Sequence, residues 1–242
     1  FKNHRVVVLF GDEPIGVKRE NIPLLEDFVG VERQKMLLVK NTQALFEGKP
    51  FNDALLWGKR GTGKSSLVRA MLNLSPHLRL FQVDKDRVEF LFKFFDLAWE
   101  LEFLKFIVLI DDLTITGEGD RTIRMLKALL DGSIVGRPKN VVVYATSNRR
   151  NLAPDQYLDG IYKFPQEEIE ERFSLVDRFG LKIGFTEFSK EDYLRAVEIY
   201  CEKFKIPFTE EVIAAALAYA ADRDFSGRTA YNFIRYYIAT QL

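Results

Sequence analysis

The hydrophobic positions in the first three quarters of the chain change period repeatedly, from short continuous apolar runs to longer stretches with helical spacing. Six runs are rich in β-branched and aromatic residues and are typical of buried strands: 6–10, 54–57, 78–83, 106–110, 141–146 and 181–185. Four stretches between the last five runs suit helices: 64–74, 88–101, 121–130 and 166–175. This alternation predicts an α/β fold, a three-layer α/β/α sandwich with a mainly parallel sheet.

The pattern after residue 185 is helical only. Ser189 and Asp192 form a capping-box signature ahead of one apolar-periodic stretch, and Thr209 and Ser226 can cap two more. We therefore predict two parts: an α/β domain at 1–186, which includes an N-terminal strand segment at 1–20, and a small all-helical domain at 187–242. Three helices of this size bury little surface alone, so we expect them to pack on the α/β domain.

A glycine-rich segment joins the second predicted strand to the first predicted helix. It reads Gly58, Lys59, Arg60, Gly61, Thr62, Gly63, Lys64, Ser65, and Ser66 follows it. The spacing fits G-x-x-x-x-G-K-[ST], the P-loop or Walker A motif. In such a loop backbone N–H groups surround phosphate oxygens, Lys64 contacts the β- and γ-phosphates, and Ser65 supplies a hydroxyl to Mg²⁺. We expect this segment, with Ser66, to bind ATP.

Two later strands end in polar side chains. The run 106–110 is followed by Asp111 and Asp112, and the tip of the run 141–146 offers Thr146, Ser147 and Asn148. We expect Asp111 to hold Mg²⁺ through water and Asp112 to orient or deprotonate the attacking water. Asn148 can position water or touch the γ-phosphate. Alone, paired acids are also common as helix caps, and Asn148 could simply begin a turn.

The composition of the chain limits its possible binding partners and its cellular location. The chain has 35 basic and 35 acidic residues, so no net charge favours nucleic acid or an anionic membrane. Cys201 is its single cysteine, which excludes a disulfide framework and fits a reducing, cytoplasmic location. The apolar run 212–221 is too short to cross a bilayer, so we expect no membrane association. The start of the chain does not fit the pattern of a signal peptide. Because the first residue is Phe1 and not Met, we expect the chain to be a fragment of a longer protein.

Taken in order, these motifs resemble the AAA+ ATPase superfamily. The segment 28–35, with Val29 and Gly30, resembles the part that lies against adenine. The segment 175–185 resembles the arginine-finger box, which makes Arg178 the finger, and 225–234 resembles sensor 2, which makes Arg228 the arginine of a helical lid. Asn148 takes the place of sensor 1. The sequences of several motifs are similar to those of a bacterial branch of the superfamily, known mainly as predicted ATPases of unknown function.

The resemblance implies different tasks for the two arginines. Arg228 would contact the γ-phosphate of its own subunit, and Arg178 that of a neighbour. Without the resemblance, a local pair with Asp177 would be favoured for Arg178. The superfamily usually has glutamate where this chain has Asp112, one methylene shorter. Hydrolysis is therefore expected to be slow, unless Glu118 or Asp120 substitutes.

These observations predict an AAA+ ATPase that self-associates into a ring or open oligomer and acts on a macromolecular partner, protein or nucleic acid. A nucleotide-dependent switch with little hydrolysis is the first alternative, favoured by the short Asp112. A small-molecule kinase is the second, and the all-helical ending argues against it. A GTPase is disfavoured because no Asn-Lys-x-Asp segment is present. Basic pairs at Lys59-Arg60 and Arg149-Arg150 could contact nucleic acid, but paired surface arginines are usually solvated.

Overall fold

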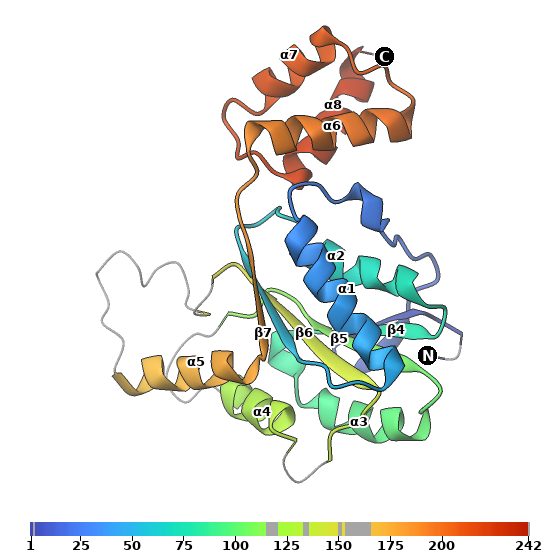
Figure 1. Ribbon diagram of the computed structural model, residues 1–242, viewed down its shortest axis with the longest axis vertical. Helices are drawn as coiled ribbons and strands as arrows, with labels where there is room; N and C mark the ends of the chain where they lie inside the picture. The colour runs from blue at the N-terminus through green and yellow to red at the C-terminus, as the bar shows by residue number, and fades with distance from the viewer. Residues whose placement is uncertain (2, 115–120, 133–135, 150–151, 153–165, 242) are drawn as a thin grey trace.

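A seven-stranded sheet forms the centre of the α/β domain in a computed structural model, which describes residues 1, 3–114, 121–132, 136–149, 152 and 166–241 (Figure 1). The strands are β1 (Val6–Phe10), β2 (Glu13–Gly16), β3 (Ala54–Gly58), β4 (Leu78–Val83), β5 (Lys105–Ile110), β6 (Val141–Ser147) and β7 (Leu181–Phe185). Their order across the sheet is β2-β1-β4-β5-β6-β3-β7. Only β2 is antiparallel to its neighbour, so the predicted mainly parallel sheet is confirmed.

The sheet is buried on both faces, because the central strands are apolar at most positions. Along β5, Phe106, Val108 and Ile110 belong to one core, whereas Ile107 and Leu109 belong to the other. Alternate side chains of a strand point to opposite faces, so a continuous apolar run can fill two cores. This arrangement confirms the three-layer architecture expected from the sequence.

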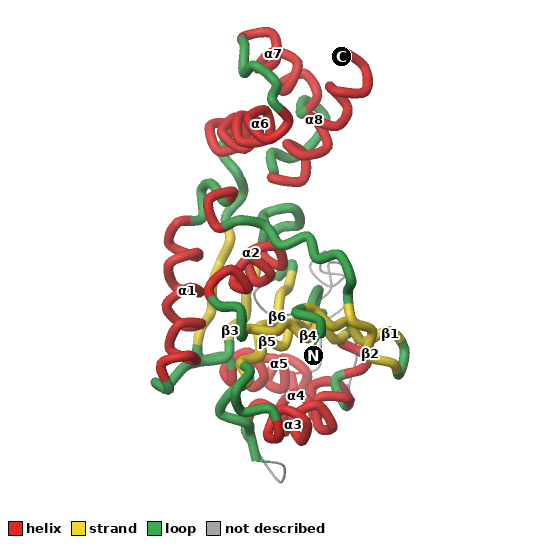
Figure 2. Tube along the Cα trace, turned by 90° about the vertical axis from the view of Figure 1, so that its right-hand side faces the viewer, coloured by secondary structure: helices red, strands yellow, loops and turns green. Residues whose placement is uncertain are grey.

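Helices cover each face of the sheet. On one face lie α1 (Glu32–Glu47), α2 (Lys64–Ala70) and the short 3-10 helix η2 (Met71–Leu74). On the other face lie α3 (Phe90–Glu100), α4 (Arg121–Leu130) and α5 (Gln166–Arg178). Figure 2 shows the sheet between these two groups. Two further 3-10 turns, η1 (Leu25–Asp27) and η3 (Lys85–Arg87), lie in connections.

Three helices follow β7 and pack around a core of their own: α6 (Lys190–Phe204), α7 (Glu210–Tyr219) and α8 (Gly227–Gln241). We refer to α6–α8 as the lid; they lie above the α/β domain in Figure 1. The caps predicted for these helices are present, since Ser189 accepts from the backbone of Asp192 and Thr209 from that of Val212. Val29, from the segment before α1, is part of the lid core.

Two elements, β2 and α1, were not expected from the sequence. Strand β2 is mostly exposed and contains Pro14 and Gly16. Its sequence therefore shows no alternation of apolar and polar residues that would predict a strand. Helix α1 begins after Val31 without a side-chain cap and therefore shows no sequence signal at its start.

The helix expected over 88–101 is α3, preceded by the separate 3-10 turn η3. Among the helices described, none is both long and apolar enough to cross a membrane.

One buried ion pair ties the strand ends on the side opposite the P-loop. Asp53 is 6% exposed, forms a two-point pair with Arg137, and accepts from the backbone of Val143 at 2.7 Å. Its carbonyl also accepts from Leu181 at 3.0 Å, so it links the starts of β3 and β7 to β6.

We expect Asp53→Asn to lower the free energy of unfolding by about 3 kcal/mol, because it leaves the Arg137 charge without its buried partner. Denaturant unfolding of Asp53→Asn, Arg137→Met and the double variant measures this. The double variant should lose less than the two single variants summed. Fully additive losses would contradict a coupled pair.

Candidate functional site

The P-loop connects β3 to α2 and contains glycines in conformations that other residues avoid. Gly61 and Gly63 have φ values of 81° and 92°, in the left-handed region. A side chain at Gly61 would also collide with Ser226, since its Cβ would lie 2.9 Å from the Ser226 hydroxyl. The loop therefore lies directly against the start of lid helix α8.

Lys64 lies beneath the loop and is almost completely buried. Its Nζ donates to the carbonyl oxygens of Gly58 and Lys59, each at 2.6 Å. Burial lowers the pKa of Lys64 to about 8, although the charges of Asp111 and Asp112 act in the opposite direction. Among the described residues no carboxylate pairs directly with this ammonium group, which is therefore placed to receive an anion.

Asp111 connects the P-loop helix to the middle of the sheet. Its Oδ1 accepts from the hydroxyl of Ser65, the first residue after Lys64, and from that of Thr146 at 2.5 Å. Strand β6 lies between β3 and β5, which places Thr146 between the other two residues. Oxygen groups from the start of α2, the end of β5 and strand β6 therefore meet at one point. Hard oxygen donors of this kind suit a divalent cation.

Asp112 lies next to this cluster at an exposed position. It has a φ of 54°, which is uncommon for a residue with a side chain. Its backbone N–H donates to the Thr146 hydroxyl at 3.0 Å, and its Oδ1 accepts from Asn148 at 2.6 Å. The guanidinium of Arg60 lies 3.4 Å from Oδ2. The carboxylate is thus oriented from both sides. Glu118 and Asp120, the predicted substitutes for this acid, lie outside the described residues.

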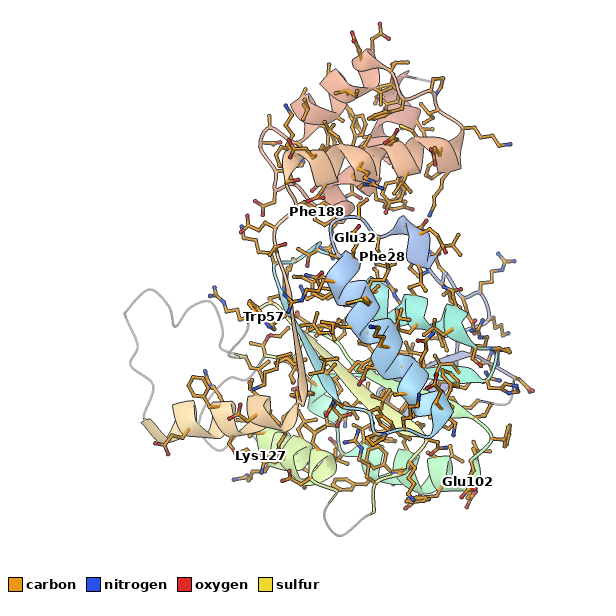
Figure 3. All side chains as sticks on the ribbon, in the orientation of Figure 1. Phe28, Glu32, Trp57, Glu102, Lys127 and Phe188 are labelled. Carbon is orange, nitrogen blue, oxygen red and sulfur yellow. The ribbon has the colours of Figure 1, made fainter. Side chains whose placement is uncertain are left out.

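The loop, the acidic pair and the lid enclose a cleft of about 890 Å³. The α/β domain contributes residues 60–66, Arg69, Asp111, Asp112, Thr146, Asn148 and the segment around Phe28, Val29 and Val31. The connection from β7 contributes Phe188, and the lid contributes Ala196, Tyr200, Lys203, Phe204, Gly227, Arg228 and Tyr231. Figure 3 shows Phe28 and Phe188 at the junction of the two parts. Both parts must keep their positions for the cleft to exist.

One wall of the cleft is aromatic and charged, and its Phe28 lies beside Gly63 of the phosphate loop. Phe28, Tyr200 and Tyr231 line it, and Lys203 of α6 forms an ion pair with Asp27 of η1 at 2.5 Å. This pair joins the lid to the α/β domain across the cleft. Aromatic faces beside a phosphate cradle suit a stacked purine base.

Not every predicted binding residue lines this cleft. Gly30 has a φ of 69° and lies against the lid, where a Cβ would be 2.8 Å from the Asp192 carboxylate. Lys59 extends away and forms an ion pair with Glu187 at 2.7 Å, a contact that raises the pKa of Lys59. Gly58 contributes its carbonyl to Lys64. These residues shape the loop and its contact with the lid.

The two arginines predicted for catalysis are far apart in the fold. Arg228 lines the cleft, and its charge contributes to lowering the pKa of Lys64. Arg178 ends α5 before β7 and lies at the opposite end of that strand from the P-loop. Its guanidinium donates to Asp131 at 2.9 Å and to the Ser174 carbonyl at 2.6 Å. Asp177 pairs instead with Lys182.

Sequence reasoning did not assign roles to the aromatic residues of the lid or to Arg69. The spacing of Tyr200 and Phe204 along α6 and of Ser66 and Arg69 along α2 places each pair on one helix face. That spacing is a usable signal only once the helix is known to face the cleft.

Solved structures with the same fold include one variant of Thermotoga maritima RuvB, at 12% identity and a TM-score of 0.54, covering 89% of this chain and 72% of that chain. A DNA replication initiation factor matches at 18% identity and a TM-score of 0.55, covering 89% of this chain and 64% of that one. These likenesses confirm the AAA+ type of fold expected from the motifs. None of the curated proteins matches the sequence.

One protein family matches the sequence over nearly its full length. The model of the family described as "Protein of unknown function (DUF815)" covers residues 10–241. This match spans the sheet from the end of β1 onward, the P-loop, the acidic pair and the lid. The chain therefore belongs to the DUF815 family and carries an AAA+ type P-loop fold.

Proposed function

We propose that this protein is an AAA+ ATPase that binds Mg²⁺-ATP in the cleft and hydrolyses it to drive or switch a macromolecular partner. The observation that carries the proposal is the junction of Lys64, Ser65 and Asp111 at the floor of a cleft closed by the lid. A buried ammonium, a serine hydroxyl and a carboxylate at this spacing are what a nucleoside triphosphate and its cation require.

The residues present fit Mg²⁺. Ser65 and Asp111 supply hard oxygen donors, with Thr146 orienting the carboxylate. In the described part of the chain, no group of three His, Cys, Asp or Glu side chains gathers as a metal site. That suits Mg²⁺, which is usually held by one or two protein groups together with phosphates and water. When bound, the cation would neutralise charge on the β- and γ-phosphates.

Hydrolysis assigns a task to each polar residue around Asp112. Asp112 accepts a proton from water as the water oxygen bonds to the γ-phosphorus, and the bond from that phosphorus to the bridging oxygen breaks. Asn148 orients the Asp112 carboxylate through the 2.6 Å contact. Lys64 and Arg228 contact the phosphates from the loop and the lid and stabilise the charge of the transition state.

A nucleotide-dependent switch with little hydrolysis is the second candidate. It is favoured by the engagement of Asp112, whose two carboxylate oxygens face Asn148 and Arg60. A short carboxylate held in this way must release Arg60 or share its oxygen to activate water. Slow turnover would let the bound nucleotide define the state of the lid.

The placement of Arg178 supports assembly. Strand β7 has five residues and rises by about 3.3 Å per residue, so Arg178 cannot reach the P-loop of its own chain. We propose that it completes the site of a neighbouring copy in a ring or open oligomer. The partner is protein or nucleic acid; the name of one similar structure, a DNA replication initiation factor, makes DNA a candidate to test first.

We expect ATP affinity to fall as the pH rises above about 8, because Lys64 loses its charge in the free protein. Bound phosphate favours the charged form, so binding above this pH takes up a proton. Calorimetric titration between pH 7 and 9.5, in buffers of different ionisation enthalpy, measures both effects. Lys64→Arg stays charged and should lose the dependence; an unchanged profile in Lys64→Arg would contradict this assignment.

We expect Asp112→Asn to reduce ATP turnover by about a hundredfold or more while ATP affinity changes little, because the amide cannot accept the proton. Phosphate release and nucleotide titration measure the two quantities. Asp111→Asn is the matched control and should weaken Mg²⁺-dependent binding instead. Turnover that survives Asp112→Asn would overturn the general-base assignment, and negligible turnover in the unmodified protein would favour the switch.

We expect Arg178→Ala to be inactive alone but to regain turnover when mixed with Asp112→Asn. In mixed assemblies, a site with intact Asp112 receives Arg178 from its neighbour, which head-to-tail contacts allow. Phosphate release at rising concentrations of the mixture measures the recovery, with each variant alone as the control. If the mixture stays as inactive as its components in assembled protein, Arg178 does not act between subunits.

A further inference from the structure

The segment 27–30, between η1 and α1, contacts both the α/β domain and the lid. Figure 1 shows this part of the chain beneath the lid. Phe28, and Val31 just after the segment, pack against the core that α1 and α2 form with the sheet. A Cβ at Gly63 of the P-loop would lie 3.5 Å from the Phe28 ring. The segment is thus fixed to the α/β domain, and its other residues contact the lid.

Val29 is a buried member of the lid core. It is 5% exposed, and the other buried members of that core, in the described part of the chain, all follow residue 190. The lid cannot move away from the segment without exposing this side chain, and the apolar surface that it covers, to water. Burial of Val29 therefore favours the position in which the lid lies over the cleft.

One face of α6 meets the segment along the length of the helix. In the first turn, the Asp192 carboxylate lies against Gly30, which has a φ of 69° and where a Cβ would be 2.8 Å away. In the last turn, Lys203 forms its ion pair with Asp27 at 2.5 Å. Ala196, which is 5% exposed and lines the cleft, lies between these two residues at helical spacing. The segment therefore holds α6 at both ends.

The carboxylate of Asp27 is positioned for this pair before Lys203 reaches it. Its Oδ2 accepts from the backbone N–H of Leu24 at 3.1 Å, and the side chain is 18% exposed. A carboxylate that is mostly shielded from water loses more when its partner leaves than an exposed one does. The pair with Lys203 therefore adds to the burial of Val29 in opposing separation.

In this chain the lid is covalently joined to the α/β domain through one connection, residues 186–189, which follows β7. The pair of Lys59 with Glu187 lies at that connection. A rotation of the lid about the connection would separate α6 from the segment 27–30. The cleft can therefore widen in this way only when the contacts of Asp27, Val29 and Gly30 with the lid break.

We propose that the segment 27–30 is a latch that holds the lid closed, and that its release controls the rate at which nucleotide enters and leaves the cleft. The effect on nucleotide rests on the proposed ATP site, whereas the latch itself does not. Because a latch acts on the opening of the lid, weakening it speeds association and dissociation together and changes the affinity little. A direct contact between Val29 and the nucleotide would instead change dissociation alone.

The first test measures both rate constants by stopped-flow fluorescence with an ADP analogue that carries the fluorophore on its ribose. Val29→Ala should raise both about tenfold and Lys203→Met about threefold, and the two factors should multiply in the double variant. The matched controls are Val197→Ala, which removes the same atoms from inside the lid core, and the exposed Lys190→Met. Both controls should stay within about twofold of the unmodified protein. Thermal unfolding of the nucleotide-free variants verifies that they fold.

The second test needs no nucleotide. In an Ala196→Cys background, the introduced thiol is covered while the lid is closed, so its reaction with a disulfide reagent reports opening. Lys203→Met should speed this reaction about threefold, while the native Cys201 in the lid core should react at an unchanged rate.

Unchanged reactivity at position 196 overturns the latch, as does faster dissociation of the ADP analogue without faster association. If the unmodified protein binds no nucleotide, the proposed function fails. The thiol reactivity at position 196 then decides by itself whether the segment holds the lid.

Discussion

The carboxylate of Asp111 joins three parts of the site, which come from the end of β5, from β6 and from helix α2 after β3. Ser65 follows β3, Thr146 ends β6 and Asp111 follows β5, and both hydroxyls bond to the same carboxylate oxygen. Strand β6 occupies the middle position, so Thr146 also accepts from the backbone of Asp112 and sets where the second acid stands. The sheet order thus determines that Asp111 faces Ser65 and Thr146, whereas Asp112 faces Asn148 and Arg60.

The lid and its connection to β7 contact the P-loop. Gly61 is in contact with Ser226 at the start of α8, and Lys59 pairs with Glu187 in the connection from β7 to α6. A phosphate in the loop would draw Lys64 from the carbonyls of Gly58 and Lys59, which lie between these two contacts. In the proposed ATP site, nucleotide binding would therefore act on the lid through the loop backbone, which carries both contacts.

The sheet and the phosphate loop could be predicted because their signals are local. The apolar run of β5 followed by Asp111 identifies both a buried strand and the acid at its end. Helix α1 was missed because Val31 offers no cap. The pair between Arg178 and Asp131 joins residues that are 47 positions apart, and no local pattern encodes it. Side chains that meet only through the fold, as the aromatic wall does, require the three-dimensional arrangement.

In the proposed ATPase, the contacts of Arg178 and Asp112 would make one chain alone a poor catalyst. Arg178 is held by Asp131 and Ser174 at the far end of β7, and a half-buried ion pair must be rearranged before its charge can serve another subunit. Asp112 is held by Asn148 and Arg60 and is shorter than glutamate. Both groups are therefore restrained in the isolated chain. A neighbour whose surface competes for Arg178, and a nucleotide whose phosphates compete for Arg60, would release the two restraints together, so that assembly and nucleotide binding become joint conditions for hydrolysis.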